Sequence, residues 1–359
     1  MNLFNYIEKY KDKSFNEVKF NEIDNMIFSG LAYLNFTNIV DNNDSYISLY
    51  EAGSIFIGKN KYKDVKKLGI AQKDGYNILK NIYNSERYSN ILLNNYIYIG
   101  DENEQFSAIT FKINDDLKYV SFEGTDNLLS GWKEDFEMSY KFPVAAQKYA
   151  IYYLNKVIKY FDKTVIVGGH SKGGNLALVS AMHLNFIKRK KVMAIYNNDG
   201  PGLRKKEIES NKYKRIKDKY IHIIPDYSYI GILLRNTNDK VIKSSKKNIL
   251  SHDMLNWQIN DKELINSELS NISKKFREST LSWLNVHNDE QRRITFETVF
   301  TSLEDAGVYY TKDIRKIRSV ISIVENLKGV EEESKILIKD FLNYNINYIL
   351  YEKLEDKND

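Results

Sequence analysis

The sequence lacks cysteine altogether, has only three prolines and contains no long apolar run, and these absences exclude several classes of protein. Without cysteine, the chain forms no disulfide, no thiolate zinc site and no cysteine nucleophile. No stretch reaches the roughly 18 apolar residues of a membrane-spanning helix. The amino-terminal segment interleaves charges with apolar positions and lacks the apolar centre of a signal peptide. We therefore expect a cytoplasmic location.

An excess of charge of one sign is also missing. The chain carries 53 basic and 48 acidic residues, a net charge of +5 over 359 residues, and 42% of its residues are hydrophobic. These values are typical of a folded globular protein and do not favour a nucleic-acid partner. Basic clusters occur at 188–191 and within 205–219, where a solvated face or a peripheral membrane contact is expected. The oligomeric state is not predicted.

The hydrophobic pattern divides the chain into three parts. Residues 1–90 are expected to form a helical cover, because Ile23, Ile27, Leu31 and Leu34 follow helical spacing. Residues 91–260 begin with three short runs rich in Tyr, Phe, Ile and Val and continue with apolar runs that alternate with helical patterns. This order predicts an α/β fold with a mainly parallel central sheet flanked by helices. Residues 261–359 read as a charged helical appendage that packs on the sheet or forms a lid or partner surface.

One of the predicted helices follows Pro143, a residue that suits the first turn of a helix. The segment VAAQKYAIYYLNKVIKYF places apolar residues along one face of this helix. These residues are Ala146, Tyr149, Tyr153, Val157 and Phe161. The sequence therefore predicts an amphipathic helix that continues as far as Phe161.

The segment TVIVGGHSKGGNLALVSA predicts a nucleophilic serine. Gly169, Ser171 and Gly173 form a G-x-S-x-G motif between an apolar strand and a small-residue helix. The turn between such a strand and helix is so sharp that larger residues in place of the glycines would collide. It lifts the Ser171 hydroxyl above the sheet and directs the backbone N–H of Lys172 towards the same space. A dinucleotide or phosphate loop is the alternative, but its glycine and lysine spacing does not fit.

The general base is sought among only five histidines. His170 adjoins the nucleophile and is expected to point away from it, and His183 lies too far along the nucleophile helix. His222 falls within an apolar run typical of a sheet-face residue, and His287 within a charged segment. His252 follows the last expected strand, KVIKSS, which matches the nucleophile–acid–base order of α/β-hydrolases. We therefore predict His252 as the base.

The acid should follow a strand between the serine and the histidine. Asp226 in HIIPDYSYIG and Asp199 in IYNNDGPG both qualify, and Asp226 is preferred because Asp199 can instead shape a Gly-Pro-Gly turn. The second oxyanion donor should come from an earlier strand end. The strand in YVSFEGTDN ends at Gly124, so Thr125 is predicted to supply its backbone N–H and its hydroxyl.

These segments resemble a known group of enzymes. SFEGTDN, GHSKGGNLA, IIPDYSYIG and SHDMLNW are similar to the fungal-lipase-like, class 3 branch of the α/β-hydrolases. KFNEIDNMIFSGLAYLNF and NNDGPGL make the chain resemble the bacterial Mbeg-like proteins, a domain of unknown function. The resemblance covers about residues 15 to 260. Glu123 stands where that branch has an arginine, and Lys172 where lipases have an apolar residue.

The resemblance implies an α/β-hydrolase fold with Ser171 as nucleophile, Asp226 as acid, His252 as base, and Thr125 and Lys172 as oxyanion donors. Together with the residue pattern, it predicts a serine hydrolase that cleaves a small-molecule or lipid ester through an acyl-enzyme, without a cofactor or metal. A thioesterase, acyltransferase or peptidase with the same triad, or a non-catalytic binding module of this fold, remain the alternatives.

Overall fold

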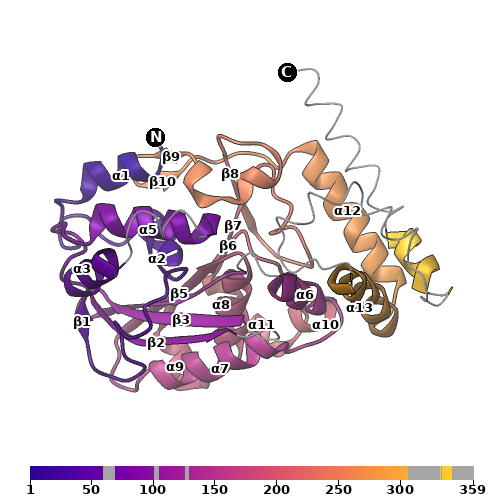
Figure 1. The fold of residues 1–359 in the computed structure, drawn as a ribbon, viewed down its shortest axis with the longest axis horizontal. Helices are drawn as coiled ribbons and strands as arrows, with labels where there is room; N and C mark the ends of the chain where they lie inside the picture. The colour runs from indigo at the N-terminus through magenta and orange to yellow at the C-terminus, as the bar shows by residue number, and fades with distance from the viewer. Residues whose placement is uncertain (60–68, 101–104, 126–128, 306–331, 333, 342–359) are drawn as a thin grey trace.

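The computed structural model gives the chain a layered arrangement of helices around one central sheet (Figure 1). It describes residues 1–59, 69–100, 105–125, 129–305, 332 and 334–341. Part of the expected carboxyl-terminal helix in KILIKDFLNYNINYILYEKL lies outside these ranges. Within them, no helix is both long enough and apolar enough to cross a membrane.

The central sheet has eight strands that lie side by side in chain order. Strands β1 to β4 pair antiparallel, and β4 to β8 pair parallel. Their bounds are β1 (Ile47–Ser48), β2 (Leu92–Gly100), β3 (Gln105–Lys112), β4 (Leu117–Phe122), β5 (Thr164–His170), β6 (Val192–Asn198), β7 (Tyr220–Pro225) and β8 (Asp239–Ile242). A small hairpin, β9 (Ile259–Asn260) with β10 (Glu263–Leu264), was not predicted. The mainly parallel α/β sheet is confirmed.

Helices cover both faces of the sheet. Their bounds are α1 (Leu3–Tyr10), α2 (Glu22–Leu31), α3 (Leu49–Lys59), α5 (Ile70–Ile82), α6 (Leu129–Glu137), α7 (Ala145–Val157), α8 (Lys172–Met182), α9 (Phe186–Lys191), α10 (Lys205–Ile208), α11 (Asn211–Lys214), α12 (Asn271–Val286) and α13 (Asp289–Asp305). Helices α1, α2 and α5 bury their apolar residues against one face, and α7 and α8 against the other (Figure 1). Alternate strand residues therefore enter two separate cores.

The expected helical cover is present at the amino terminus. Ile23, Ile27, Leu31 and Leu34 are all buried in the core between α2 and the sheet. The helix after Pro143 is shorter than expected, because α7 ends at Val157. Phe161 is 83% exposed and packs in neither core, so its predicted place on the helix face is wrong.

The carboxyl-terminal helices α12 and α13 pack on α6, and α12 also contacts the end of the sheet through Phe276, which packs with Ile224 of β7. Trp283, Phe296 and Phe300 form a small core into which Trp132 and Phe136 of α6 insert. The rings of Phe136 and Phe296 lie 4.7 Å apart. Helix α6 is the first described helix after β4, and α12 and α13 lie against it beside the sheet (Figure 1).

A buried ion pair holds the amino-terminal helices in place. Arg87 Nη2 donates to Asp24 Oδ2 at 2.7 Å, and neither side chain is exposed to solvent. Asp24 also accepts hydrogen bonds from Tyr88 Oη at 2.7 Å and from the backbone N–H of Asn21 at 3.0 Å. Every oxygen of this carboxylate therefore has a partner, which a buried charge requires.

We expect Asp24→Asn to lower the free energy of unfolding by about 3 kcal/mol, because it leaves the buried Arg87 guanidinium without its counter-ion. Urea unfolding followed by circular dichroism measures this loss. The matched control is the exposed Asp12→Asn, which should change stability by no more than about 0.5 kcal/mol. Equal stability of the two variants would contradict a structural role for this pair.

Candidate active site

The turn at Ser171 has the strained geometry of a nucleophile elbow. Ser171 lies between β5 and α8 with φ 57° and ψ −132°, a conformation that non-glycine residues rarely adopt. A Cβ on Gly169 would lie 2.5 Å from the carbonyl oxygen of Gly173, and a Cβ on Gly173 would lie 2.2 Å from that of Phe122. The two glycines are therefore required by the close packing of the elbow against the end of β4.

The sheet register brings three strand ends together around this elbow. Phe122 of β4 is aligned with Gly169 of β5, and His170 of β5 with Asn198 of β6. The residues that follow these strands consequently meet at one edge of the sheet, as the carboxyl ends of parallel strands do. Among them are Thr125 and Asp199.

His252 is held by a carboxylate at this edge. Its Nδ1–H donates to Oδ2 of Asp199 at 2.7 Å, and the His252 side chain is 22% exposed whereas that of Asp199 is fully buried. The donation fixes the tautomer and leaves Nε2 as a hydrogen-bond acceptor. Among the described residues, the Ser171 hydroxyl makes no hydrogen bond.

Asp199 is fixed by the loop that follows β7. Its Oδ1 accepts hydrogen bonds from the Ser228 hydroxyl and from the backbone N–H of Gly231, the latter at 3.0 Å. The backbone of Asp199 has a positive φ of 50°. Both oxygens therefore have partners, and one of them faces the imidazole.

The expected pairing of Asp226 with His252 is wrong. Asp226 Oδ1 accepts from the backbone N–H of Ser244 at 3.1 Å, and Oδ2 from the Ser267 hydroxyl at 3.4 Å. Its backbone carbonyl accepts from the N–H of Ser270, the N-cap of α12. Asp226 thus connects the segment after β8 and the start of α12 to the end of β7. It lies one strand further from the elbow than Asp199, which follows β6.

His170, next to the candidate nucleophile, supports the loop that carries His252. Its Nε2–H donates to the backbone carbonyl of His252 at 2.8 Å, and the Tyr33 hydroxyl donates to its Nδ1 at 2.9 Å. Burial, and then the nearby His252, hold the pKa of His170 well below its usual value, so the ring is neutral. From the sequence, His170 was expected only to point away from Ser171, and its hydrogen bond to His252 was not predicted.

The two expected oxyanion donors lie on either side of the elbow. Lys172 is the first residue of α8, where the backbone N–H has no acceptor within the helix. Thr125 follows Gly124, whose Cβ would lie 3.1 Å from that of Ser171. The Thr125 hydroxyl, however, donates to Asp135 Oδ2 at 2.6 Å, so its predicted part as a second donor is not supported.

A cluster of buried charges lies beside these donors. Lys172 is 1% exposed, and its Nζ lies 3.1 Å from Glu134 Oε2 on α6. Burial acts to lower the pKa of Lys172, but the charges of Glu134, Asp135 and Glu123 outweigh it and raise this pKa. Burial likewise raises the pKa of Asp135 to about 6, against the opposing effect of Lys172. The charge of Lys172 is thus compensated mainly by Glu134, with smaller effects from Asp135 and Glu123.

The other histidines are engaged away from the elbow. His222 is fully buried and its Nδ1 lies 2.7 Å from Asp239, as expected for a sheet-face residue. His183 and His287 each contact a carbonyl of their own helix. Within the described ranges, no group of three or more His, Cys, Asp and Glu side chains is arranged to bind a metal ion.

The parallel sheet and the strained Ser171 elbow define an α/β-hydrolase fold, as predicted. A family model described as Mbeg1-like matches residues 82–301, and the chain belongs to this family. The expected Mbeg-like resemblance is confirmed.

Two further similarities are partial. The crystal structure of M37 lipase is 14% identical with a TM-score of 0.34, over 58% of this chain and 68% of that one. UDP-N-acetylmuramate–L-alanine ligase from Borrelia garinii subsp. bavariensis is 24% identical over 136 residues, 35% of this chain. The match spans 28% of the ligase.

We expect Lys172→Met to lower the free energy of unfolding by about 3 kcal/mol, because it leaves the buried carboxylates of α6 without their cation. Chemical denaturation measures the loss, and Lys172→Met combined with Glu134→Gln should recover part of it. The control is Lys133→Met on α6, because the ion pair of Lys133 with Glu304 is partly exposed and worth less than about 1 kcal/mol. A Lys172→Met variant as stable as the Lys133→Met variant would show that the cluster contributes little.

Proposed function

We propose that this protein is a serine hydrolase that cleaves carboxylic esters through an acyl-enzyme, with Ser171 as nucleophile, His252 as base and Asp199 as acid. The observation that carries the proposal is the 2.7 Å hydrogen bond from His252 Nδ1 to Asp199, at the sheet edge where the elbow presents Ser171. A buried carboxylate that fixes the tautomer of an imidazole beside a strained serine is the arrangement that acyl transfer requires.

In the first step, Nε2 of His252 accepts the proton of the Ser171 hydroxyl while Oγ attacks the ester carbonyl carbon. Since the Ser171 hydroxyl makes no hydrogen bond to a described residue, it is free to turn towards His252 as substrate enters; such contacts commonly tighten in the substrate complex. Asp199 stabilises the imidazolium that forms. The hydrogen bond from His170 to the His252 carbonyl holds the loop that carries His252 in place during the proton transfer.

The negative charge that develops on the carbonyl oxygen needs donors that are already in position. The backbone N–H groups of Lys172 and Thr125 are suited to this role, because they flank Ser171 from α8 and from the end of β4. The hydrogen bond from the Thr125 hydroxyl to Asp135 orients the Thr125 backbone. Asp135 is in this way a positioning residue for the oxyanion donor.

The tetrahedral intermediate then collapses, and His252 returns its proton to the leaving alkoxide. Water, deprotonated by the same imidazole, attacks the acyl-enzyme; the bond to Ser171 Oγ breaks, the imidazolium returns the proton to that oxygen, and the carboxylic acid leaves. The ammonium group of Lys172 does not add charge to the substrate mouth, because it is buried against Glu134. An uncharged ester carbonyl is therefore the substrate group that fits the elbow.

Labelling with a fluorophosphonate probe tests the nucleophile. We expect an adduct on Ser171, no adduct in Ser171→Ala, and a fall in p-nitrophenyl ester turnover of at least about 10³-fold in that variant. The matched control is Ser54→Ala, an exposed serine of α3 that should keep full activity. Turnover retained by folded Ser171→Ala protein would refute the site.

The acid is tested by comparing Asp199→Asn with Asp226→Asn. Asp199→Asn should lower kcat by about 10³- to 10⁴-fold, because an amide no longer selects the tautomer in which Nε2 accepts. Asp226→Asn should lower kcat less than about 10-fold and act mainly on stability. Steady-state kinetics combined with thermal unfolding separates the two effects. The reverse ranking of kcat would assign the acid to Asp226.

A further inference from the structure

A second site lies away from the elbow, between the hydrolase core and the carboxyl-terminal helices. A cavity of about 230 Å³ is lined there by the segment after β6, the loop before β8, and helices α12 and α13. Its basic residues are Arg204, Lys205, Lys206, Arg235 and Arg292. No residue of the proposed triad or oxyanion hole lines it.

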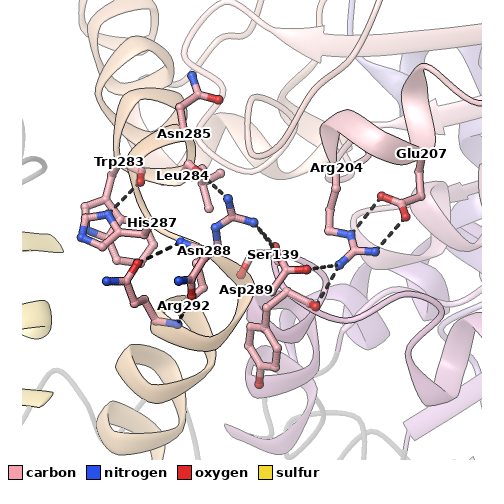
Figure 2. A network of polar contacts seen from close by, with 12 residues as sticks. Ser139, Arg204, Glu207, Trp283, Leu284, Asn285, His287, Asn288, Asp289 and Arg292 are labelled. Carbon is pink, nitrogen blue, oxygen red and sulfur yellow. Dashed lines mark hydrogen bonds and ion pairs between the residues drawn. The ribbon is translucent and has the colours of Figure 1, made fainter.

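The three arginines that line this cavity pair with only two carboxylates among the described residues. Glu207 forms a two-pronged pair with Arg204, through Nη2 at 2.7 Å and Nε at 2.9 Å. Asp289 is divided between Arg204 at 3.3 Å and Arg292 at 2.9 Å (Figure 2). Arg235 donates to the amide oxygen of Asn285 and forms no ion pair with a described residue.

The rim adds further positive charge. Lys205 and Lys206 are exposed and have no ion-pair partner among the described residues. Three guanidinium and two ammonium groups thus face two carboxylates. Burial lowers the pKa of Arg292, and the charges of Arg204 and Arg235 lower it further against the opposing effect of Asp289.

Hydrogen-bond donors are in excess as well. Arg292 donates to the backbone carbonyls of Ser139 and Leu284 (Figure 2), yet its buried Nε has no acceptor among the described residues. Unpaired buried donors are uncommon and unfavourable. An anion with several oxygens would supply both the missing charge and the missing acceptors.

We propose that this cavity binds the phosphoryl group of a phosphate monoester. Guanidinium groups match phosphate oxygens in charge and geometry, and a dianion balances the excess better than a single carboxylate. Leu203, Leu234 and Leu281 also line the cavity, which suits a short carbon backbone attached to the phosphate. The volume lies below the roughly 300 Å³ of drug-sized ligand sites, so it suits a group of the size of glycerol phosphate.

Calorimetric titration of the full chain with inorganic phosphate and with sn-glycerol 3-phosphate tests the site. We expect saturable binding that Arg235→Gln weakens at least about 10-fold and that Lys205→Gln with Lys206→Gln weakens about 3-fold. The Arg235 side chain hydrogen-bonds only to Asn285 among the described residues, its backbone bonds to Leu203 do not depend on the side chain, and both lysines are exposed, so these variants should fold. The matched control is Arg293→Gln, on α13 but paired on the exposed side with Glu290 and Glu297, which should bind normally.

Co-sedimentation with phosphatidylcholine vesicles, with and without phosphatidic acid, distinguishes the source of the phosphate. Binding of the soluble ligands identifies a free phosphate monoester. Binding only to vesicles that contain phosphatidic acid, abolished by Arg235→Gln, identifies a lipid headgroup. No binding of either the soluble ligands or the vesicles, or an equal loss of affinity in Arg235→Gln and Arg293→Gln, would overturn the proposal. Ser171→Ala should bind normally, so failure of the proposed hydrolase activity leaves this test intact.

Discussion

The backbone turn at Ser171 is the constraint on which the rest of the site depends. A non-glycine residue at φ 57° costs about 1 to 3 kcal/mol and persists only where its surroundings enforce it. Here the Ser171 N–H donates to the Asn198 carbonyl at 2.9 Å, and the Ser171 carbonyl packs against Gly200, where a Cβ would lie 2.1 Å away. The ends of β4, β5 and β6 must therefore approach one another closely, and the same approach gathers Thr125, Ser171 and Asp199.

The amino-terminal helices take part in enforcing this geometry. Asn198, which is fully buried, accepts from Asn25 at 2.9 Å and donates to Ser29 at 3.0 Å, both on α2, as well as to the Gly169 carbonyl at 3.1 Å. Such a network is favourable only when every member has a partner. Because Tyr33 also binds His170, α2 and the turn after it support both the elbow and the loop of His252. The predicted cover is thus part of the site's framework.

The sequence predicted the features that depend on local pattern. The strands, the elbow glycines and the position of His252 after the last parallel strand follow from residue spacing and chain order. The choice between Asp199 and Asp226 depended on which strand end lies beside the elbow and on where each carboxylate finds donors. Asp199 follows the strand paired with β5, whereas the donors to Asp226 come from Ser244 and Ser267, far along the chain. The one available signal was that Asp199 follows the first strand after the nucleophile helix.

Local pattern also could not predict the pairing of charged residues that lie far apart in the chain. Lys172 stands beside the nucleophile where lipases have an apolar residue, and its partner Glu134 lies 38 residues away on α6. Sequence spacing cannot reveal that a lysine and a glutamate separated by a helix and a strand share one buried space. The favourable pairing of Glu123, Glu134 and Asp135 with Lys172 depends on all four residues being brought together by the fold.

The contacts of α6 also connect the carboxyl-terminal helices to the hydrolase core. Helix α6 carries Glu134 and Asp135 towards the elbow and presents Trp132 and Phe136 to α12 and α13. An aromatic face of this size is unfavourable in water, so α6 needs those helices to stay in place. The Mbeg1-like match extends to residue 301 and so includes α12 and most of α13. Residues 271–305 thus pack against the helix whose Asp135 accepts the hydrogen bond from Thr125 beside the elbow.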